Sequence, residues 1–199
     1  MGMRREPRRS PGRLAGRGAG KRGVALIEFA LILPVIIILA MATIDFGRLI
    51  QARLVVSNVS REGGSVASRE TTINPGLVGL LQASGRPLDM AGSDGRIYLT
   101  RIAAGESRDA PAPTIATQLV GGSLGAGSRI AAGNPNLGLS QNLYNHLVFN
   151  TTNGASDISE ITVVEVFYKY RPITPLPNFI QGMLLPDGDG MIVWSKAVF

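Results

Sequence analysis

The hydrophobic pattern of the chain is dominated by one run near its N-terminus, from Val24 to Ile44, in which Glu28 is the only charged residue. Its 21 residues would extend for about 31 Å as an α-helix. That length is enough to cross the hydrocarbon core of a bilayer once. We therefore predict a transmembrane helix over residues 24–44.

A second helical pattern follows over residues 45–70, where charged side chains occupy one set of positions and apolar side chains another. The apolar members recur near helical spacing: Ile50, Leu54, Val55, Val59 and Val66. We predict that the helix continues amphipathically and that this stripe packs against the core of the same chain. Gly63 and Gly64 either end the helix or allow a close backbone approach, and Pro75 ends it in any case.

Three later segments, 96–102, 161–170 and 191–199, have the pattern of β-strands. The middle strand carries one set of alternating residues on a single face: Thr162, Val164, Val166, Tyr168 and Tyr170. Glu165 and Lys169 interrupt the other face, which predicts a half-buried antiparallel strand.

The segments between these strands predict less regular structure. Glycine and proline are frequent over residues 103–135, which favours an irregular insertion. A short helix is expected within 135–149. Pro172, Pro175 and Pro177 interrupt the connection before the last strand, and we expect this connection to hold a short helix near 178–185 and a turn over 187–190.

The net charge of +6 is unevenly distributed along the chain, so it does not describe the body of the protein. Residues 1–23 carry eight basic residues and one glutamate, so this leader is +7 and the rest of the chain is about −1. The body therefore has no cationic excess for a nucleic acid, and no nucleic-acid partner is expected. Basic residues directly before the apolar run predict a cytoplasmic N-terminus and an exported C-terminal body over residues 71–199.

Two other readings of the N-terminus stay open. Ala40 and Ala42 form an A-x-A arrangement, so a secretory signal peptide cut after Ala42 is one alternative. The long charged leader, the span-length run and Glu28 weigh against it. The other alternative is an uncleaved single-pass anchor that holds an envelope scaffold or binding domain.

The carboxylate of Glu28 needs a partner, because an unpaired acid near the membrane costs roughly 1–3 kcal/mol. A cut between Gly23 and Val24 would create an ammonium group four residues before it, in the first turn of the helix. Glu28 could then pair with Val24 of its own chain as a cap, or with Val24 of a neighbouring chain and so set the register of two helices.

The stretch KRGVALIEF resembles the cleavage region of type IV prepilins and pseudopilins. Residues 22–70 resemble more narrowly the N-terminal region of TadE-like proteins, the pseudopilins or minor pilins of the tight-adherence (Tad/Flp) type IVb pilus. The resemblance implies a scissile bond after Gly23, a mature N-terminus at Val24, assembly and register roles for Glu28 and Phe29, and a proline in the apolar helix at Pro34. A kink is the simplest consequence of Pro34.

The same resemblance implies an α+β, pilin-like fold, in which a long N-terminal helix, first transmembrane and then amphipathic, packs on a small antiparallel sheet. It implies an inner-membrane precursor with a periplasmic C-terminal domain that reaches the extracellular pilus after assembly. The implied partners are a prepilin peptidase, other pilin and pseudopilin subunits and the pilus assembly platform proteins. Cell adhesion and biofilm formation are the implied context.

No motif predicts an enzyme, a cofactor site or a metal site. His146 is the only histidine, and the glycine-rich stretch 121–127 lacks the Lys-Ser/Thr and the strand-to-helix context of a phosphate loop. The DGDG sequence at 187–190 lacks the further ligands of an EF-hand loop, so a hairpin turn is favoured. We therefore expect a non-enzymatic protein.

Overall fold

The computed structural model describes residues 19–70, 72–174 and 190–199, with side chains from Gly23 onward. The chain divides into two compact units, residues 1–42 and residues 43–199, which are described separately. Helix α1, Ala19–Ala67, supplies the described part of the first unit and then enters the second.

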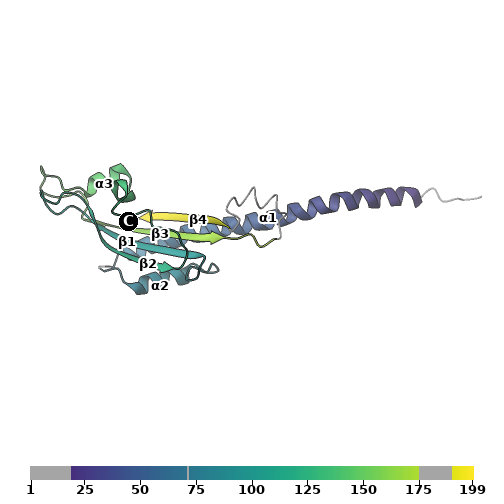
Figure 1. Cartoon of the computed structure of the whole chain (residues 1–199), viewed down its shortest axis with the longest axis horizontal. Helices are drawn as coiled ribbons and strands as arrows, with labels where there is room; N and C mark the ends of the chain where they lie inside the picture. The colour runs from purple at the N-terminus through teal and green to yellow at the C-terminus, as the bar shows by residue number, and fades with distance from the viewer. Residues whose placement is uncertain (1–18, 71, 175–189) are drawn as a thin grey trace, which may run out of the picture. The chain divides into compact units, whose positions relative to one another are not determined.

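The second unit is built on a four-stranded antiparallel sheet with the strand order β2-β1-β3-β4 (Figure 1). Its strands are β1 Gly95–Ala103, β2 Thr114–Gly122, β3 Glu160–Tyr170 and β4 Met191–Val198. The three predicted strands are confirmed to within one residue at each end. The prediction of an α+β fold with a long N-terminal apolar helix and an antiparallel sheet is also confirmed.

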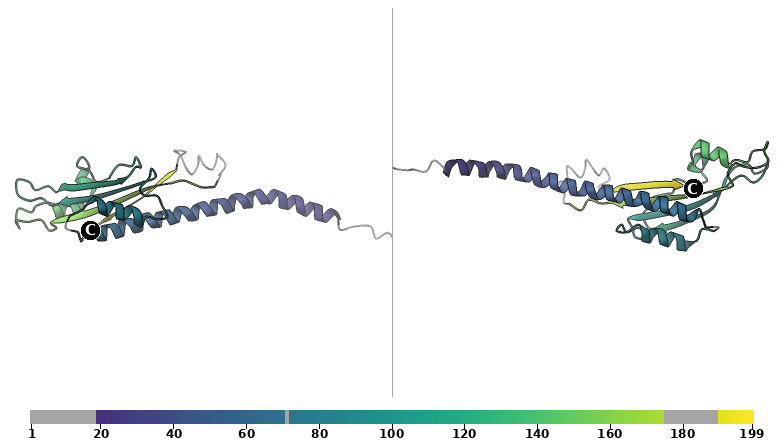
Figure 2. Two further views of the ribbon diagram at one scale, coloured as in Figure 1. Left: turned by 90° about the horizontal axis from the view of Figure 1, so that it is seen from below. Right: turned by 180° about the vertical axis from the view of Figure 1, so that it is seen from behind.

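Helices cover one face of this sheet. The second half of α1 and helix α2, Pro75–Ser84, lie on the same side of the strands (Figure 2). Their apolar side chains, among them Val56, Val59 and Leu81, form one core with residues of β1 and β3. Burial of this shared apolar surface is what holds α1 and α2 on the sheet.

The opposite face is covered by irregular chain and two short helices. These are a 3-10 helix, η1 Pro135–Gly138, and helix α3, Gln141–Leu147, which confirms the short helix expected within 135–149. A second apolar core joins this layer to the sheet through residues such as Ile130, Leu147 and Val163. The helix expected near 178–185, and most of the turn expected over 187–190, lie outside the described residues.

The expectation of an irregular insertion over 103–135 is wrong for residues 114–122. They form β2, which pairs with β1 along its whole length, from Arg96 opposite Gly122 to Ala103 opposite Thr114. The side chains of this segment do not show a clear strand pattern, and it ends in two glycines. It is a strand because hydrogen bonds to β1 satisfy its backbone N–H and C=O groups. Gly122 has φ +82, a left-handed conformation that suits glycine at the end of the strand.

Strand β3 is buried on both faces, although its pattern predicted a half-buried strand. Residues 161–167 are all buried, including Glu165 at 0% exposure. The reason is the second layer, because residues 123–147 cover the face that Glu165 shares. Glu165 interrupts the apolar pattern of a strand that is buried on both faces, and hydrogen bonds from Ser128 and Arg129 satisfy its buried carboxylate.

The predicted apolar stripe of the amphipathic helix is also wrong in large part. Val59 is buried and Val55 half-buried, but Ile50, Leu54 and Val66 are exposed. The face that meets the sheet is instead made mostly of small and polar residues: Asp45, Ala52, Val56, Val59, Ser60, Gly63 and Ala67. Small side chains let the helix backbone approach its neighbours closely.

Helix α1 continues through its two adjacent glycines, Gly63 and Gly64, which allow other side chains to lie close to the helix backbone. A Cβ added at Gly63 would lie 2.6 Å from Cδ2 of Leu81, and one at Gly64 would lie 2.1 Å from the ring of Phe199. Neither distance is available to a real Cβ atom, so glycine is the residue that fits both positions as they stand.

Helix α1 ends at Ala67, eight residues before the proline that was expected to end it. The buried guanidinium of Arg101 donates Nη2 to the carbonyl oxygens of Ala67 at 3.3 Å and Glu70 at 2.6 Å, and so caps the end of the helix. Pro75 instead begins α2, where its fixed φ and missing N–H suit the first turn. Asn74 caps that helix by accepting the N–H of Leu77 at 3.1 Å.

Candidate assembly site on helix α1

The predicted processing and assembly residues all lie on the part of α1 that belongs to the first unit. Val24 and Phe29 are 57% and 58% exposed, and Glu28 is exposed as well. None of the apolar window of this helix is buried inside the chain. This surface is long and apolar enough to cross a membrane, and it is available to lipid or to helices of other molecules.

Glu28 follows Val24 by four residues in the same helix, so the two positions lie about one turn apart, roughly 6 Å along the axis. In the uncut chain α1 already begins at Ala19, and the nitrogen of Val24 is therefore a peptide nitrogen and not an ammonium. Over residues 23–70, 72–174 and 190–199, the Glu28 carboxylate makes no hydrogen bond or ion pair. The pairing of Glu28 with an N-terminal amine stays a prediction.

Gly23 and Pro34 also lie within α1. A Cβ added at Gly23 would meet none of the described side chains within 4 Å, so packing against the described part of the chain does not require glycine there. Pro34 is incorporated without ending the helix, and the kink at this position stays a prediction.

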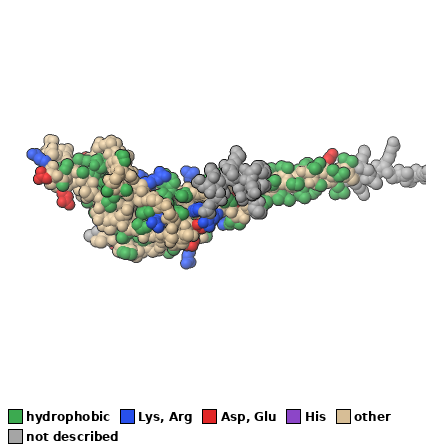
Figure 3. Space-filling model, in the orientation of Figure 1, with side chains coloured by type: hydrophobic (Ala, Val, Ile, Leu, Met, Phe, Trp, Pro, Cys, Tyr) green, Lys and Arg blue, Asp and Glu red, His purple; other side chains and the backbone are tan. Residues whose placement is uncertain are grey.

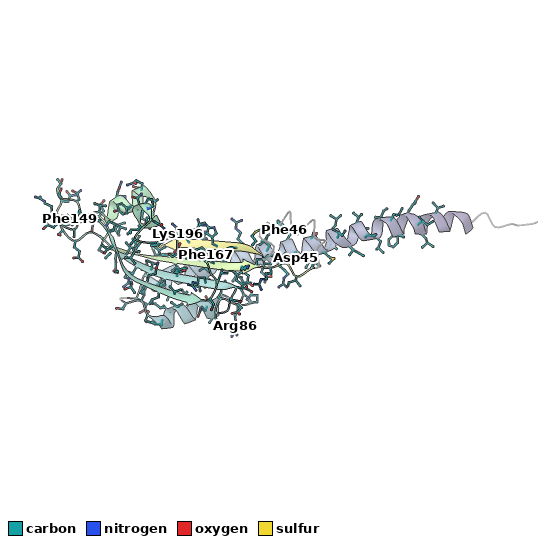
Figure 4. The ribbon with its side chains drawn as sticks, viewed as in Figure 1. Asp45, Phe46, Arg86, Phe149, Phe167 and Lys196 are labelled. Carbon is teal, nitrogen blue, oxygen red and sulfur yellow. The ribbon has the colours of Figure 1, made fainter. Side chains whose placement is uncertain are left out.

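Where α1 leaves the apolar run, an acid that the sequence analysis did not single out is buried against the sheet. Asp45 is 6% exposed and belongs to the second unit, at the end of the sheet where β3 finishes and β4 begins (Figure 4). Its carboxylate accepts the N–H of Ile173 at 3.0 Å and of Thr174 at 3.3 Å, and the Thr174 hydroxyl also donates to it. The Tyr170 hydroxyl donates to the Asp45 carbonyl oxygen at 2.9 Å. We call Asp45, Tyr170, Ile173 and Thr174 the Asp45 clamp.

The clamp favours a charged carboxylate. Burial acts to raise the pKa of Asp45, but the hydrogen bonds from Thr174, Ile173 and Tyr170 outweigh it and leave the pKa below its usual value. Burial, followed by the negative charge of Asp45, raises the pKa of Tyr170, so the phenol stays a hydrogen-bond donor. Both shifts favour the protonation states that the clamp uses, a charged carboxylate and a neutral phenol.

The sequence shows an acid at position 45 but does not show that it is buried. Asp45 directly follows the apolar run, and a carboxylate at such a position can be solvated by water as well as bound by another part of the chain. Its partners lie 125 to 129 residues later, and nothing in a pattern of neighbours pairs them. Arg101, the cap of α1, was missed for the same reason.

Glu165 is a second buried carboxylate, and it acts on the opposite face of the sheet. It accepts the Ser128 hydroxyl at 2.5 Å and the N–H of Arg129 at 3.1 Å. The Arg129 guanidinium lies 3.6 Å from the centroid of the Trp194 ring, and that ring stacks on Phe167. This arrangement holds the loop after β2 against the sheet, which is a structural role.

The other residues considered for a catalytic, phosphate-binding or metal-binding role make packing or surface contacts. His146 pairs with Asp157, with 2.8 Å between Nδ1 and Oδ2, and the two side chains are 46% and 58% exposed. Gly121 of the glycine-rich stretch lies in β2, where an added Cβ would lie 2.4 Å from Val78 of α2. The glycine therefore allows α2 to pack closely on this strand. In the described part of the chain, no group of three or more histidine or acidic side chains could hold a metal ion.

A scan against protein families matched residues 23–65 to the family described as TadE-like protein. The N-terminal region of this chain is therefore similar to that family. The match runs from the predicted scissile glycine through the Asp45 position of α1 and stops two residues before the helix ends. Searches of curated proteins and of solved structures gave no match.

Proposed function

We propose that this chain is a pseudopilin or minor pilin that takes part in assembly of a tight-adherence (Flp) pilus, and that a prepilin peptidase matures it by cutting after Gly23. The observation that carries the proposal is the TadE-like match over residues 23–65, which begins at that glycine. No described residue lies within 4 Å of a Cβ added at Gly23, which supports recognition by another protein as the reason for the glycine.

The proposed topology follows from the distribution of charge. Residues 1–23 form a basic cytoplasmic leader, 24–44 cross the inner membrane, 45–70 continue the helix, and 71–199 form a periplasmic domain. The positive-inside bias supports this orientation. The division of the chain into units at residues 42 and 43 supports the membrane boundary, because it falls within two residues of Ile44.

In the proposed mechanism, proteolysis supplies the partner that Glu28 lacks. The new ammonium of Val24 on one chain pairs with the carboxylate of Glu28 on its neighbour, and the low dielectric of the surroundings makes the pairing depend strongly on register. Apolar contacts between helices supply most of the assembly energy, and exposed Phe29 beside Glu28 contributes to them. Other pilin and pseudopilin subunits and the assembly platform are the proposed partners.

The mass of the N-terminus in material purified from a piliated host tests the cleavage. A start at Val24 is expected. A start at Met1 would indicate instead a permanently anchored envelope protein, and a start at Thr43 would indicate a secreted one. Either of these results would contradict the proposal.

A Glu28→Ala variant tests the register role separately from cleavage. We expect it to insert and to be cut, because the scissile bond is intact, but to fail to enter pili. Glu62→Ala is the matched control, since Glu62 is an exposed acid further along the same helix. Pilus incorporation of each variant is measured by immunoblotting of sheared pili. Normal incorporation of the Glu28→Ala variant would remove the register role while leaving the cleavage proposal standing.

A further inference from the structure

The sheet of the second unit has two edges, formed by β2 on one side and β4 on the other (Figure 1). Within the described part of the chain, the backbone groups of residues 117–121 hydrogen-bond only with β1, and those of residues 192–197 only with β3. An edge strand directs half of its N–H and C=O groups away from its one neighbour. Each edge is therefore able to pair with a strand of another molecule.

The edge formed by β2 lacks the features that commonly prevent such pairing. Its sequence, TIATQLVGG, contains no charged residue and no proline. A bulge leaves Ala116 without a partner in β1, so the regular part of this edge is 117–122. In β4 the one charged residue, Lys196, donates from Nζ to the Gly138 carbonyl oxygen at 3.1 Å, which holds its charge against η1. The charges of the two edge strands therefore do not exclude a partner.

Exposed apolar side chains lie at both edges and on the same face of the sheet. Val120 of β2 is 48% exposed, and Ile192 and Trp194 of β4 are 49% and 41% exposed. Val120 is opposite Tyr98 and Trp194 is opposite Phe167, and the Tyr98 and Phe167 rings contact each other with centroids 6.1 Å apart. Directly opposite residues share a face. A β2 edge placed beside a β4 edge would thus bring these exposed side chains together.

The two edge strands run in opposite directions, and α1 runs alongside β4. All three pairings in the sheet are antiparallel, so β2 is antiparallel to β4. The Asp45 carbonyl oxygen accepts from Tyr170, which is opposite Met191 at the start of β4. Further along both elements, Ser60 Oγ lies 2.8 Å from Ser195 Oγ. This part of α1 and strand β4 therefore point the same way.

The membrane sets the relative direction of neighbouring copies. Copies that insert through the apolar half of α1, on which Figure 3 shows mostly hydrophobic side chains, enter the bilayer in one direction. Two such copies side by side bring β2 of one beside β4 of the other in antiparallel order. Antiparallel pairing of β2 with a second β2 would instead reverse one of the two domains.

We propose that β2 of one copy of this chain pairs antiparallel with β4 of a second copy, which joins their sheets edge to edge. The register sets residues 117–122 against 192–197, with Val120 opposite Trp194, because an aromatic and a β-branched residue make a favourable cross-strand pair. The contact is heterologous, so it repeats from copy to copy. The inference rests on the membrane insertion contained in the proposed function, but not on cleavage.

Crosslinking in host membranes tests the contact, and the chain has no cysteine of its own to interfere. Two differently tagged full-length chains are co-expressed, one with Thr117→Cys and the other with Ala197→Cys, which the proposed register places opposite each other. A short bismaleimide should give a dimer that carries both tags. Thr151→Cys, at an exposed threonine outside the sheet, replaces Thr117→Cys in the control and should give none. Equal yields from the two pairs, no mixed dimer, or a dimer of Thr117→Cys chains alone would overturn the proposal.

A charge on the β2 edge tests the same contact without moving the thiols. Val120→Lys, added to the Thr117→Cys chain, should lower the yield of mixed dimer about fivefold, because the lysine removes an apolar pair and opposes edge pairing. Leu80→Lys is the matched control, since Leu80 is 56% exposed on α2 and outside the sheet, and it should leave the yield unchanged. An undiminished yield in a Val120→Lys chain that unfolds in urea like the wild type, or an equal loss in both variants, would contradict the pairing.

The N-terminal mass separates this inference from the proposed function. Mixed dimers of chains that start at Met1 would support the edge pairing while removing the cleavage. Chains that start at Val24 and enter pili but give no mixed dimer would refute the edge pairing alone.

Discussion

At the scale of single residues, two acids of α1 behave in opposite ways. Glu28 is exposed on the apolar half of the helix and has no partner among the described residues, whereas Asp45 is buried and fully hydrogen-bonded within its own chain. The first is therefore available to another molecule. The second is committed to the fold, and its value can be measured as stability.

We expect Asp45→Asn to lower the free energy of unfolding of the second unit by about 1–3 kcal/mol, because an amide oxygen and an NH₂ group cannot replace an ionised acceptor of several N–H and O–H groups. Fluorescence of Trp194, the single tryptophan, reports unfolding in urea for the full chain in detergent. Asp109→Asn, at an exposed acid, should change stability by less than 0.5 kcal/mol by the general behaviour of surface sites. Similar effects of both variants would refute the clamp.

The pKa of Asp45 adds a pH dependence to this prediction. Because its pKa is lower in the folded chain than in the unfolded one, its contribution is fully present above the unfolded pKa of about 4 and is lost as the pH falls through the folded pKa. The difference between wild type and Asp45→Asn should thus be constant from pH 5 to 8 and shrink below pH 4. A difference that persists unchanged at lower pH would show that the carboxylate charge is not what matters.

At the scale of elements, α1 meets the sheet with its small residues and exposes larger apolar ones such as Ile50 and Leu54. A pattern search finds the large residues first, and it therefore assigned the wrong face to the core. Two glycines of α1 differ in their surroundings. A Cβ added at Gly63 would meet Leu81 of α2, whereas one added at Gly47 would meet no described residue within 4 Å.

Alanine at these two glycine positions of α1 should consequently change the free energy of unfolding in opposite directions. Gly47→Ala should stabilise the helix by roughly 0.5–1 kcal/mol, because alanine has the better helix propensity and nothing lies within 4 Å of the new Cβ. Gly63→Ala should destabilise by about 1–2 kcal/mol net, because the methyl group overlaps Leu81, which is itself buried in the core. Urea titrations followed by Trp194 fluorescence check both, and stabilisation by Gly63→Ala would contradict the close approach.

At the scale of the whole molecule, both apolar cores and the Asp45 clamp belong to residues 43–199, and the apolar half of α1 contributes no buried side chain. The folded domain therefore does not depend on the membrane-length segment for its core. What joins the domain to the helix is the stretch of α1 between Thr43 and Ala67.

Truncation tests where the domain begins. A chain that starts at Thr43 should fold and remain soluble, whereas one that starts at Arg48 should melt about 4–8 °C lower, because it loses the Asp45 clamp. Circular dichroism melting curves of the two fragments provide the comparison. Equal melting temperatures would place the boundary of the domain after the clamp.

The sequence by itself determined what depends on neighbouring residues. The apolar run, the leader charge, the strands with strong β patterns and the short helix over 141–147 follow from local periodicity and composition, and the TadE-like motif is read from contiguous residues. Only the tertiary structure decided which face of α1 is buried, that residues 114–122 form a strand, and that Glu165 lies inside the fold. Each of these depends on partners distant in the chain: Leu81 and Phe199 for the glycines, β1 for β2, and Ser128 for Glu165. Such pairings are selected by the free energy of the whole packed chain, which no local pattern contains.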